Sequence, residues 1–155
     1  MKNILITGGT GFIGSHTCIP LLENGFNITV IDSNINSSEK SLKGILKIVK
    51  KKYHSNLSFH KGDIRNSEFL VSIFDHCKRK NKSINAVIHF AGLKAIGESV
   101  KKPLLYWDMN FNGTLNLLKV MNEFDCSSIV FSSSASIYGK ESNQLSKETS
   151  STKPT

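Results

Sequence analysis

The chain has 155 residues, an apolar fraction of 39% and no uninterrupted apolar stretch long enough for a membrane span, so we expect one soluble domain with a real core. Its formal net charge is +8, but the lysines are spread along the chain without a recognition motif. We therefore interpret the charge as a solvated surface and expect neither a nucleic-acid partner nor a membrane partner.

Residues 3–7 form a short apolar run that ends in a cluster of glycines, and a helix-like pattern follows directly. Gly8 permits a sharp turn, Gly11 lets the backbone approach a pyrophosphate, and Gly14 lets the helix lie close to the strand. The free N–H groups at the start of that helix favour an anion. This segment predicts a strand, a phosphate-binding turn and a helix.

The second predicted strand, residues 27–31, is closed by Asp32, which lies 18 positions after Gly14. A dinucleotide-binding fold places near that position a carboxylate that accepts hydrogen bonds from the adenosine ribose. An acidic residue there also repels a 2′-phosphate, which favours NAD over NADP. The alternative reading is an aspartate that caps a turn.

Two longer helices are predicted from apolar periodicity. Residues 38–53 alternate an apolar face with a lysine face, typical of a crossover helix packed on a sheet, although a membrane-surface helix has a similar pattern. Residues 104–124 read as one long helix whose apolar stripe predicts core packing. The stripe consists of Trp107, Phe111, Leu115, Leu118 and Met121.

Three further strands are predicted at residues 57–61, 86–90 and 128–131. The near-continuous apolar character of residues 86–90 is what a parallel sheet covered on both faces demands. Five strands alternating with helices predict a three-layer α/β fold, a Rossmann-type doubly wound parallel sheet. We place an incomplete domain at residues 1–139 and a polar loop or disordered tail at residues 140–155.

Cys18, Cys77 and Cys126 are far apart in sequence, which suits unpaired thiols in a reducing cytoplasm. No signal-peptide pattern precedes the first strand. The five histidines show no metal-ligand spacing, so we expect no metal.

Five motifs resemble those of the extended short-chain dehydrogenase/reductase family, in the right order and spacing, from residue 1 to about residue 139. They lie at residues 7–16, 62–65, 89–99, 110–114 and 131–139. The most specific is the run HFAGLKAIGES at residues 89–99, which is similar to that of the UDP-glucose 4-epimerases. The resemblance implies that NAD takes a hydride from C4 of a UDP-hexose and returns it to the other face of the sugar.

The resemblance also implies residue roles. Ser134 matches the family serine that hydrogen-bonds the reacting hydroxyl; its alternative role is a turn serine. Cofactor contacts are expected at Gly8, Gly11, Phe12, Ile13, Gly14, Asp32, Asn36, Ser37, Asp63, Ile64, Phe90, Ala91, Gly92, Lys94, Asn110 and Ser132.

The family's Tyr-x-x-x-Lys couple has no match in these residues. Tyr53, Tyr106 and Tyr138 are followed four positions later by Leu, Asn and Ser. We therefore expect the N-terminal part of an epimerase, which binds NAD weakly and does not epimerise a UDP-sugar by itself.

Homodimerisation is expected for the complete enzyme, and the helix at residues 104–124 is then expected to expose apolar surface here. The alternatives are an epimerase for another nucleotide sugar, a dehydratase and a non-catalytic NAD-binding module. Ala135 and Ser136 disfavour the dehydratase, because dehydratases of the family carry Asp-Glu there.

Overall fold

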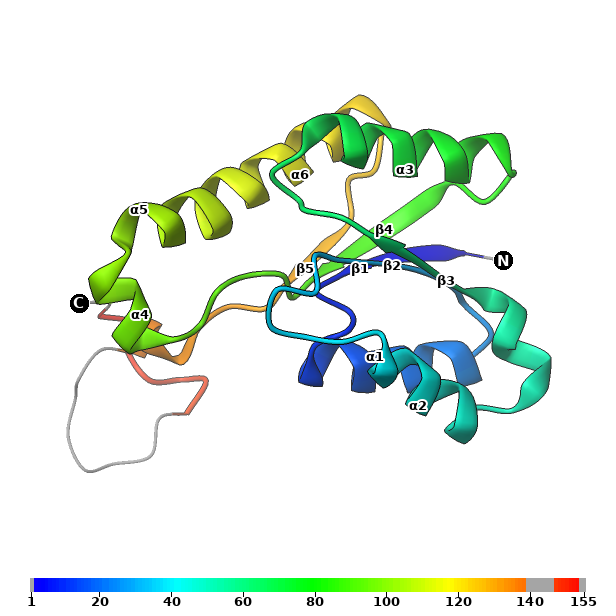
Figure 1. The fold of residues 1–155 in the computed structure, drawn as a ribbon, viewed down its shortest axis with the longest axis horizontal. Coiled ribbons are helices and arrows are strands. Elements are labelled where there is room, and N and C mark those ends of the chain that lie inside the picture. The colour runs from blue at the N-terminus through cyan, green and yellow to red at the C-terminus, as the bar shows by residue number, and fades with distance from the viewer. Residues whose placement is uncertain (1, 139–146, 154–155) are drawn as a thin grey trace.

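A single parallel sheet organises the computed structural model, which describes residues 2–138 and 147–153 (Figure 1). The strands lie in the order β3-β2-β1-β4-β5, and every neighbouring pair is parallel. Their bounds are β1 Asn3–Thr7, β2 Asn27–Asp32, β3 Leu57–Lys61, β4 Ile84–His89 and β5 Ile129–Phe131. The strand order reverses between β1 and β4, where the ligand crevice of an open α/β sheet forms.

Helices cover both faces of this sheet (Figure 1). α1 (Phe12–Glu23) and α2 (Lys40–Ile48) pack on one face, whereas α3 (Ser67–Arg79) and α6 (Gly113–Glu123) pack on the other. The predicted three-layer, doubly wound architecture with five strands is therefore confirmed.

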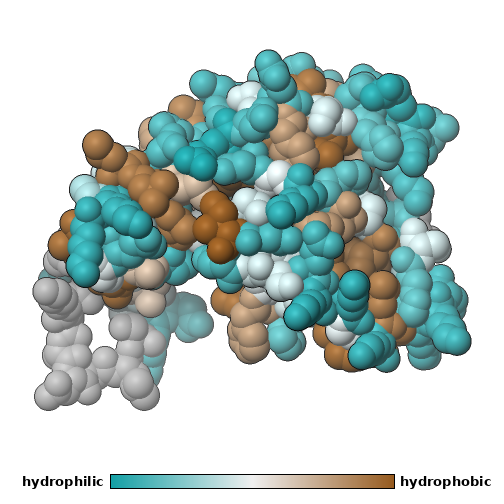
Figure 2. Space-filling view, viewed as in Figure 1, coloured by the Kyte–Doolittle hydropathy of each residue, from teal (hydrophilic) through white to brown (hydrophobic). Residues whose placement is uncertain are grey.

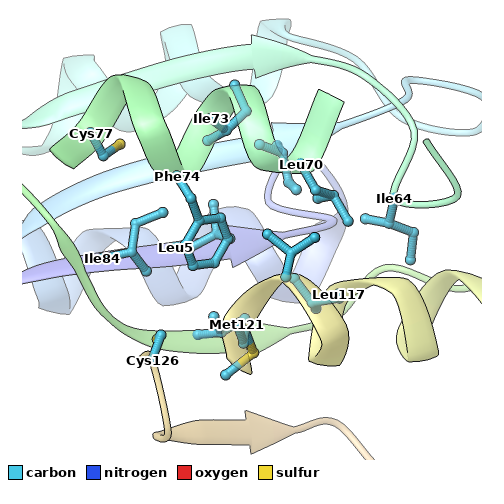
Figure 3. Packing of buried hydrophobic residues seen from close by; sticks show 13 residues of the cluster. Leu5, Ile64, Leu70, Ile73, Phe74, Cys77, Ile84, Leu117, Met121 and Cys126 are labelled. Atoms are coloured by element: carbon cyan, nitrogen blue, oxygen red, sulfur yellow. The ribbon is translucent and has the colours of Figure 1, made fainter. Parts of the chain in front are cut away.

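The two layers of core arise from the alternation of side chains along each strand. On β1, Ile4 and Ile6 join the cluster under α1 and α2, whereas Leu5 joins the cluster under α3 and α6. In that second cluster Leu117 of α6 points toward Leu70 of α3 (Figure 3). The sheet is thus buried on both faces, as its apolar strands require.

The helix predicted at residues 38–53 is shorter than expected. α2 ends at Ile48, Val49 is extended with ψ 141°, and the 3₁₀ helix η1 (Lys51–Asn56) follows. Val49 is nevertheless 3% exposed and joins the core with Leu42 and Ile45 of α2. The apolar spacing thus continues past the end of the α-helix, which is why periodicity did not reveal the break.

The helix predicted at residues 104–124 is divided into three pieces. α5 (Pro103–Tyr106) leads into the π-helical segment η2 (Trp107–Asn112), and α6 follows; the short α4 (Ile96–Lys101) precedes them. The prediction that the apolar stripe packs in the core is wrong for most of its residues. Trp107 is 64% exposed and Phe111 55%, while Met121 is 3% exposed.

Apolar side chains gather over α5 in the space-filling view (Figure 2). In the segments that follow α5, four residues of the stripe are at least 39% exposed: Trp107, Phe111, Leu115 and Leu118. The expectation of exposed apolar surface on this helix is therefore met. None of the described helices is both long and apolar enough to cross a membrane.

The C-terminal part of the described chain follows β5, which pairs only with β4 among the described strands. After β5, Ser132 donates its N–H to the His89 carbonyl at 3.1 Å, and the 3₁₀ helix η3 (Ala135–Tyr138) follows. Residues 139–146 and 154–155 lie outside the described residues, so the domain boundary at residue 139 and the polar tail at residues 140–155 stay predictions.

Candidate functional site

The glycine turn after β1 is shaped by close backbone approach. Gly8 has φ +67°, and a Cβ there would lie 2.7 Å from the backbone nitrogen of Ala91. A Cβ on Gly14 would collide with the carbonyl oxygen of Gly8. These two contacts bring the start of α1 against the ends of both β1 and β4.

The N-terminus of α1 opens at this turn. Gly11 is the N-cap and offers no side chain to the first turn, which begins at Phe12. The first N–H groups of a helix have no partner within the helix, and the dipole is positive there. The arrangement fits a phosphate that approaches Phe12 and Ile13.

Asp32, at the end of β2, organises the second loop. Its Oδ2 accepts the Thr10 N–H at 3.0 Å, and its Oδ1 accepts the Asn34 N–H and the Ser37 hydroxyl, both at 2.9 Å. Asp32 and Ser37, both predicted as cofactor contacts, are therefore in direct contact with each other. The carboxylate also caps a turn, so the two readings of Asp32 are compatible.

Asp63 follows β3 and is held by Arg65 through several bonds. Arg65 donates from Nη2 to Oδ2 at 2.7 Å, from its backbone N to Oδ1 at 2.9 Å, and from Nε to both oxygens. The hydrogen bonds from Arg65 lower the pKa of Asp63, against a smaller effect of burial. The Asp63 carboxylate is thus fixed in position and kept ionised.

Arg65 also bonds to residues of η2 and α6. Its Nη1 donates to Asp108 Oδ2 of η2 at 2.7 Å, and its carbonyl oxygen accepts from the Asn116 side chain at 2.8 Å. Ile64 lies against Gly113, where a Cβ would come within 2.8 Å of its side chain. The loop after β3 is therefore clamped onto η2 and α6.

The loop after β4 is held by Asn110 of η2. The Asn110 side chain accepts the Leu93 N–H at 2.8 Å and donates to the Leu93 carbonyl at 3.0 Å. Lys94 is exposed next to this contact, and its Cε lies 3.8 Å from where a Gly92 Cβ would be.

The loops after β1, β2, β3 and β4 enclose one cavity of about 230 Å³. Most of the predicted cofactor residues line it: Gly8, Gly11, Phe12, Asp32, Asn36, Ser37, Asp63, Ile64, Phe90, Ala91 and Gly92. These residues come from four separate loops, so the fold brings together what the sequence places far apart.

The remaining predicted residues lie outside the lining of this cavity. Ile13 and Gly14 belong to the first turn of α1 behind Phe12, Lys94 and Asn110 lie beyond Leu93, and Ser132 follows β5. Ser134 is exposed, and its hydroxyl lies 2.8 Å from that of Ser136. The structure does not bring Ser134 into the cavity.

The cavity has further lining residues that sequence reasoning missed: Ile31, Ser33, Ile35, Gly62, Leu93 and Met109. Five of them are direct neighbours, in the same loops, of residues that were predicted. Met109 is the neighbour of the predicted Asn110, but residues 104–124 read as one regular helix, and nothing in that helical spacing marked Met109 as a residue that lines the cavity.

A parallel sheet in the order β3-β2-β1-β4-β5, with a glycine turn at β1 and a carboxylate at the end of β2, defines a Rossmann-type domain. The family model for GDP-mannose 4,6 dehydratase matches residues 5–155. The chain belongs to that family.

The curated proteins to which this chain is similar include UDP-glucose 4-epimerases. The chain is 49% identical to UDP-glucose 4-epimerase 2 of Arabidopsis thaliana over 138 residues, which are 89% of this chain and 38% of the relative. It is 47% identical to a bifunctional UDP-glucose 4-epimerase and UDP-xylose 4-epimerase of Pisum sativum over 139 residues, 90% of this chain and 38% of the relative.

Among solved structures, the chain is similar to UDP-glucose 4-epimerase from Bifidobacterium longum in complex with NAD+ and UDP. The TM-score is 0.85 at 39% identity, over 98% of this chain and 43% of that one. The resemblance read from the sequence is confirmed, and the chain spans less than half the length of these relatives.

Proposed function

We propose that the chain is the NAD-binding part of a UDP-glucose 4-epimerase, which interconverts UDP-glucose and UDP-galactose. The observation that carries this proposal is the cavity, which gathers the predicted cofactor residues of four loops at the carboxyl ends of the strands. The NAD-bound relative from Bifidobacterium longum supports it.

The residues present fit NAD on chemical grounds. The open N-terminus of α1 suits the pyrophosphate, and Asp32 offers acceptors for ribose hydroxyls while disfavouring a 2′-phosphate. Asp63 and Ile64 would flank the adenine. Phe90, Ala91 and Gly92 would line the path toward the nicotinamide.

Bound NAD would supply reversible hydride transfer at C4 of the sugar. Within this chain, Ser134 would hold the reacting hydroxyl by a hydrogen bond. None of the three tyrosines has a lysine four positions later, so we propose that these 155 residues alone bind the cofactor without turning over a UDP-sugar.

The partners proposed for the complete enzyme are a UDP-hexose and a second copy of the chain. The exposed stripe of η2 and α6 supports the homodimer, because contiguous apolar surface of this kind marks association sites. The three cysteines are buried free thiols, which supports the expected cytoplasmic location.

A second candidate is an epimerase with a different UDP-sugar preference, favoured by the bifunctional relative from Pisum sativum. The dehydratase alternative is weaker, because Ala135 and Ser136 carry no acid or base for loss of water. A non-catalytic NAD-binding module would share the cofactor site and differ only in having no sugar substrate.

Isothermal titration of the 155-residue chain with NAD and NADP tests the cofactor proposal. We expect NAD to bind more tightly than NADP, and Asp32→Asn to reduce that preference. Asp75→Asn is the matched control, because Asp75 pairs with Arg79 on the surface of α3. Absence of NAD binding would refute the proposal, and turnover of UDP-galactose by the chain would refute its inactivity.

A further inference from the structure

His89 is the last residue of β4 and is almost entirely buried, with 1% of its surface exposed. Its Nδ1 lies 2.5 Å from the hydroxyl oxygen of Thr7, which is its register partner on β1. Its Nε2 lies 2.9 Å from the hydroxyl oxygen of Thr114 on α6. Both ring nitrogens are therefore engaged between two strands and a helix.

The neighbouring contacts fix the direction of each of these bonds. Thr114 donates its hydroxyl hydrogen to the Asn110 carbonyl at 2.6 Å, so it can only accept from His89. His89 must then carry its proton on Nε2 and accept from Thr7 at Nδ1. Burial lowers the pKa of His89 to about 4, with a smaller effect from Lys94, so the ring is neutral.

The chain of bonds ends at the wall of the cavity. The Thr7 oxygen accepts the N–H of Ala91 at 3.2 Å, and Ala91 lines the cavity. The bonds thus run from Ala91 through Thr7, His89 and Thr114 to Asn110. Asn110 in turn holds Leu93 through its side chain, so one end of the turn 91–93 bonds to Asn110 directly and the other is linked to it through Thr7, His89 and Thr114.

The turn begins with Ala91, which packs against the core cluster under α3 and α6, and Gly92, which has no side chain. Hydrogen bonds add to this packing in setting the backbone position of the turn, and His89 links the sheet to α6. In a doubly wound sheet the two halves of a dinucleotide lie on either side of the switch point. The turn after β4 belongs to the half that does not hold the adenosine.

We infer that His89 is a positioning residue for the nicotinamide-side wall of the cofactor site, an inference that rests on the proposed function. Through Thr7 and Thr114 it sets the place of the turn 91–93 without touching the cofactor. Its loss should therefore weaken binding of the whole dinucleotide while sparing a ligand that carries only the adenosine half.

Thr114→Val tests this by removing one link while keeping the shape of the side chain. Thr17→Val is the matched control, since Thr17 makes the same backward bond to the Ile13 carbonyl at 3.0 Å on α1. Isothermal titration with NAD and with ADP separates the two halves. We expect Thr114→Val to weaken NAD on the order of tenfold and ADP by less than about twofold.

Equal losses of affinity for NAD and ADP, or no loss, would overturn the inference, because a general structural role would weaken the binding of both ligands equally. If the wild-type chain binds ADP but not NAD, the proposed function fails, and the inference falls with it. His89→Phe and His89→Gln give a second series: the amide of Gln can both donate and accept, so it should restore part of the NAD affinity that Phe loses.

A spectroscopic readout tests the bond directions in the wild-type chain itself. Long-range ¹H–¹⁵N correlation of the wild-type chain reports which imidazole nitrogen carries the proton. We expect His89 to show only the neutral Nε2–H form in the wild type at pH 6, and a mixture of the Nε2–H and Nδ1–H forms in Thr114→Val. A charged ring or an Nδ1–H form in the wild type would contradict the bond directions on which the inference depends.

Discussion

Arg65 and Asp108 form an ion pair of 2.7 Å that joins the loop after β3 to the π-helical segment η2. The same guanidinium holds Asp63, which lines the cavity. An element with an exposed apolar stripe is thus connected, through one arginine, to a carboxylate of the candidate cofactor site.

Replacing Arg65 with methionine should raise the pKa of Asp63 toward the ordinary value of an aspartate, because the hydrogen bonds from Arg65 are the main cause of its lowering. Carboxyl ¹³C titration measures this pKa directly. Arg79→Met, which breaks the surface pair with Asp75, is the control and should leave Asp63 unaffected.

The pairing of Arg65 with Asp63 also predicts how the stability of the fold depends on pH. A carboxylate with a lowered pKa in the folded state stabilises the fold above its unfolded pKa, and that contribution is lost as the pH falls through the folded pKa. Acid should therefore unfold the wild type more steeply below about pH 4 than it unfolds Arg65→Met. Parallel acid-unfolding curves for the two proteins would contradict this.

His89 should give a second and separate pH dependence. Its pKa is lowered from 6.5 to about 4, so the unfolded chain binds a proton that the folded chain excludes. Stability should be complete above about pH 6.5 and decline as the pH falls toward 4, by on the order of 3 kcal/mol. Urea unfolding across this range should show the full decline in the wild type and in His16→Gln, whose histidine is exposed, and a smaller decline in His89→Gln, where the lowered pKa of His60 still contributes.

Three glycine substitutions separate backbone strain from close approach. Gly8→Ala should lower the free energy of unfolding by about 2–5 kcal/mol, because φ is +67° and the new Cβ meets Ala91. Gly25→Ala should lose only about 1 kcal/mol, since its φ is +81° but no atom lies within 4 Å. Gly44→Ala, in the open middle of α2, should gain about 0.5–1 kcal/mol. Chemical denaturation measures all three, and equal effects at Gly8 and Gly25 would refute the close approach.

The exposed stripe predicts self-association. Trp107 and Phe111 pack against each other with ring centroids 5.6 Å apart and lie on the surface. Replacing both with glutamine should shift the chain toward monomer in sedimentation or light-scattering measurements, with the dissociation constant raised more than about tenfold. Ile48→Gln, at a 65% exposed position on α2, is the control and should change nothing.

The sequence was sufficient for the sheet and for most of the cavity, because both follow from local patterns. Apolar runs marked the strands. Asp32, Asp63 and Ala91 each lay at the end of a strand or within two residues of it, so parallel strands had to bring them to one edge. Periodicity identified the apolar stripe of residues 104–124 but not what it faces. A stripe of Trp107 and Phe111 has the same spacing whether it meets a core or solvent.

The long-range bonds were out of reach for the same reason. Arg65 and Asp108 lie 43 positions apart, and Thr7 and His89 lie 82 positions apart. Neither pair follows from a local motif. The π-helical segment was also hidden, since its apolar residues keep helical spacing while Met109 turns into the cavity.

The edge strand β5 makes this chain prone to aggregation. Val130 is 63% exposed and Phe131 57%, and one side of the strand is open among the described residues. An apolar strand with free backbone donors and acceptors is a template on which another chain can add a strand, the first step toward fibrillar or amorphous precipitate. A lysine in place of Val130 should act as a gatekeeper, raising the concentration the protein tolerates without touching the cavity.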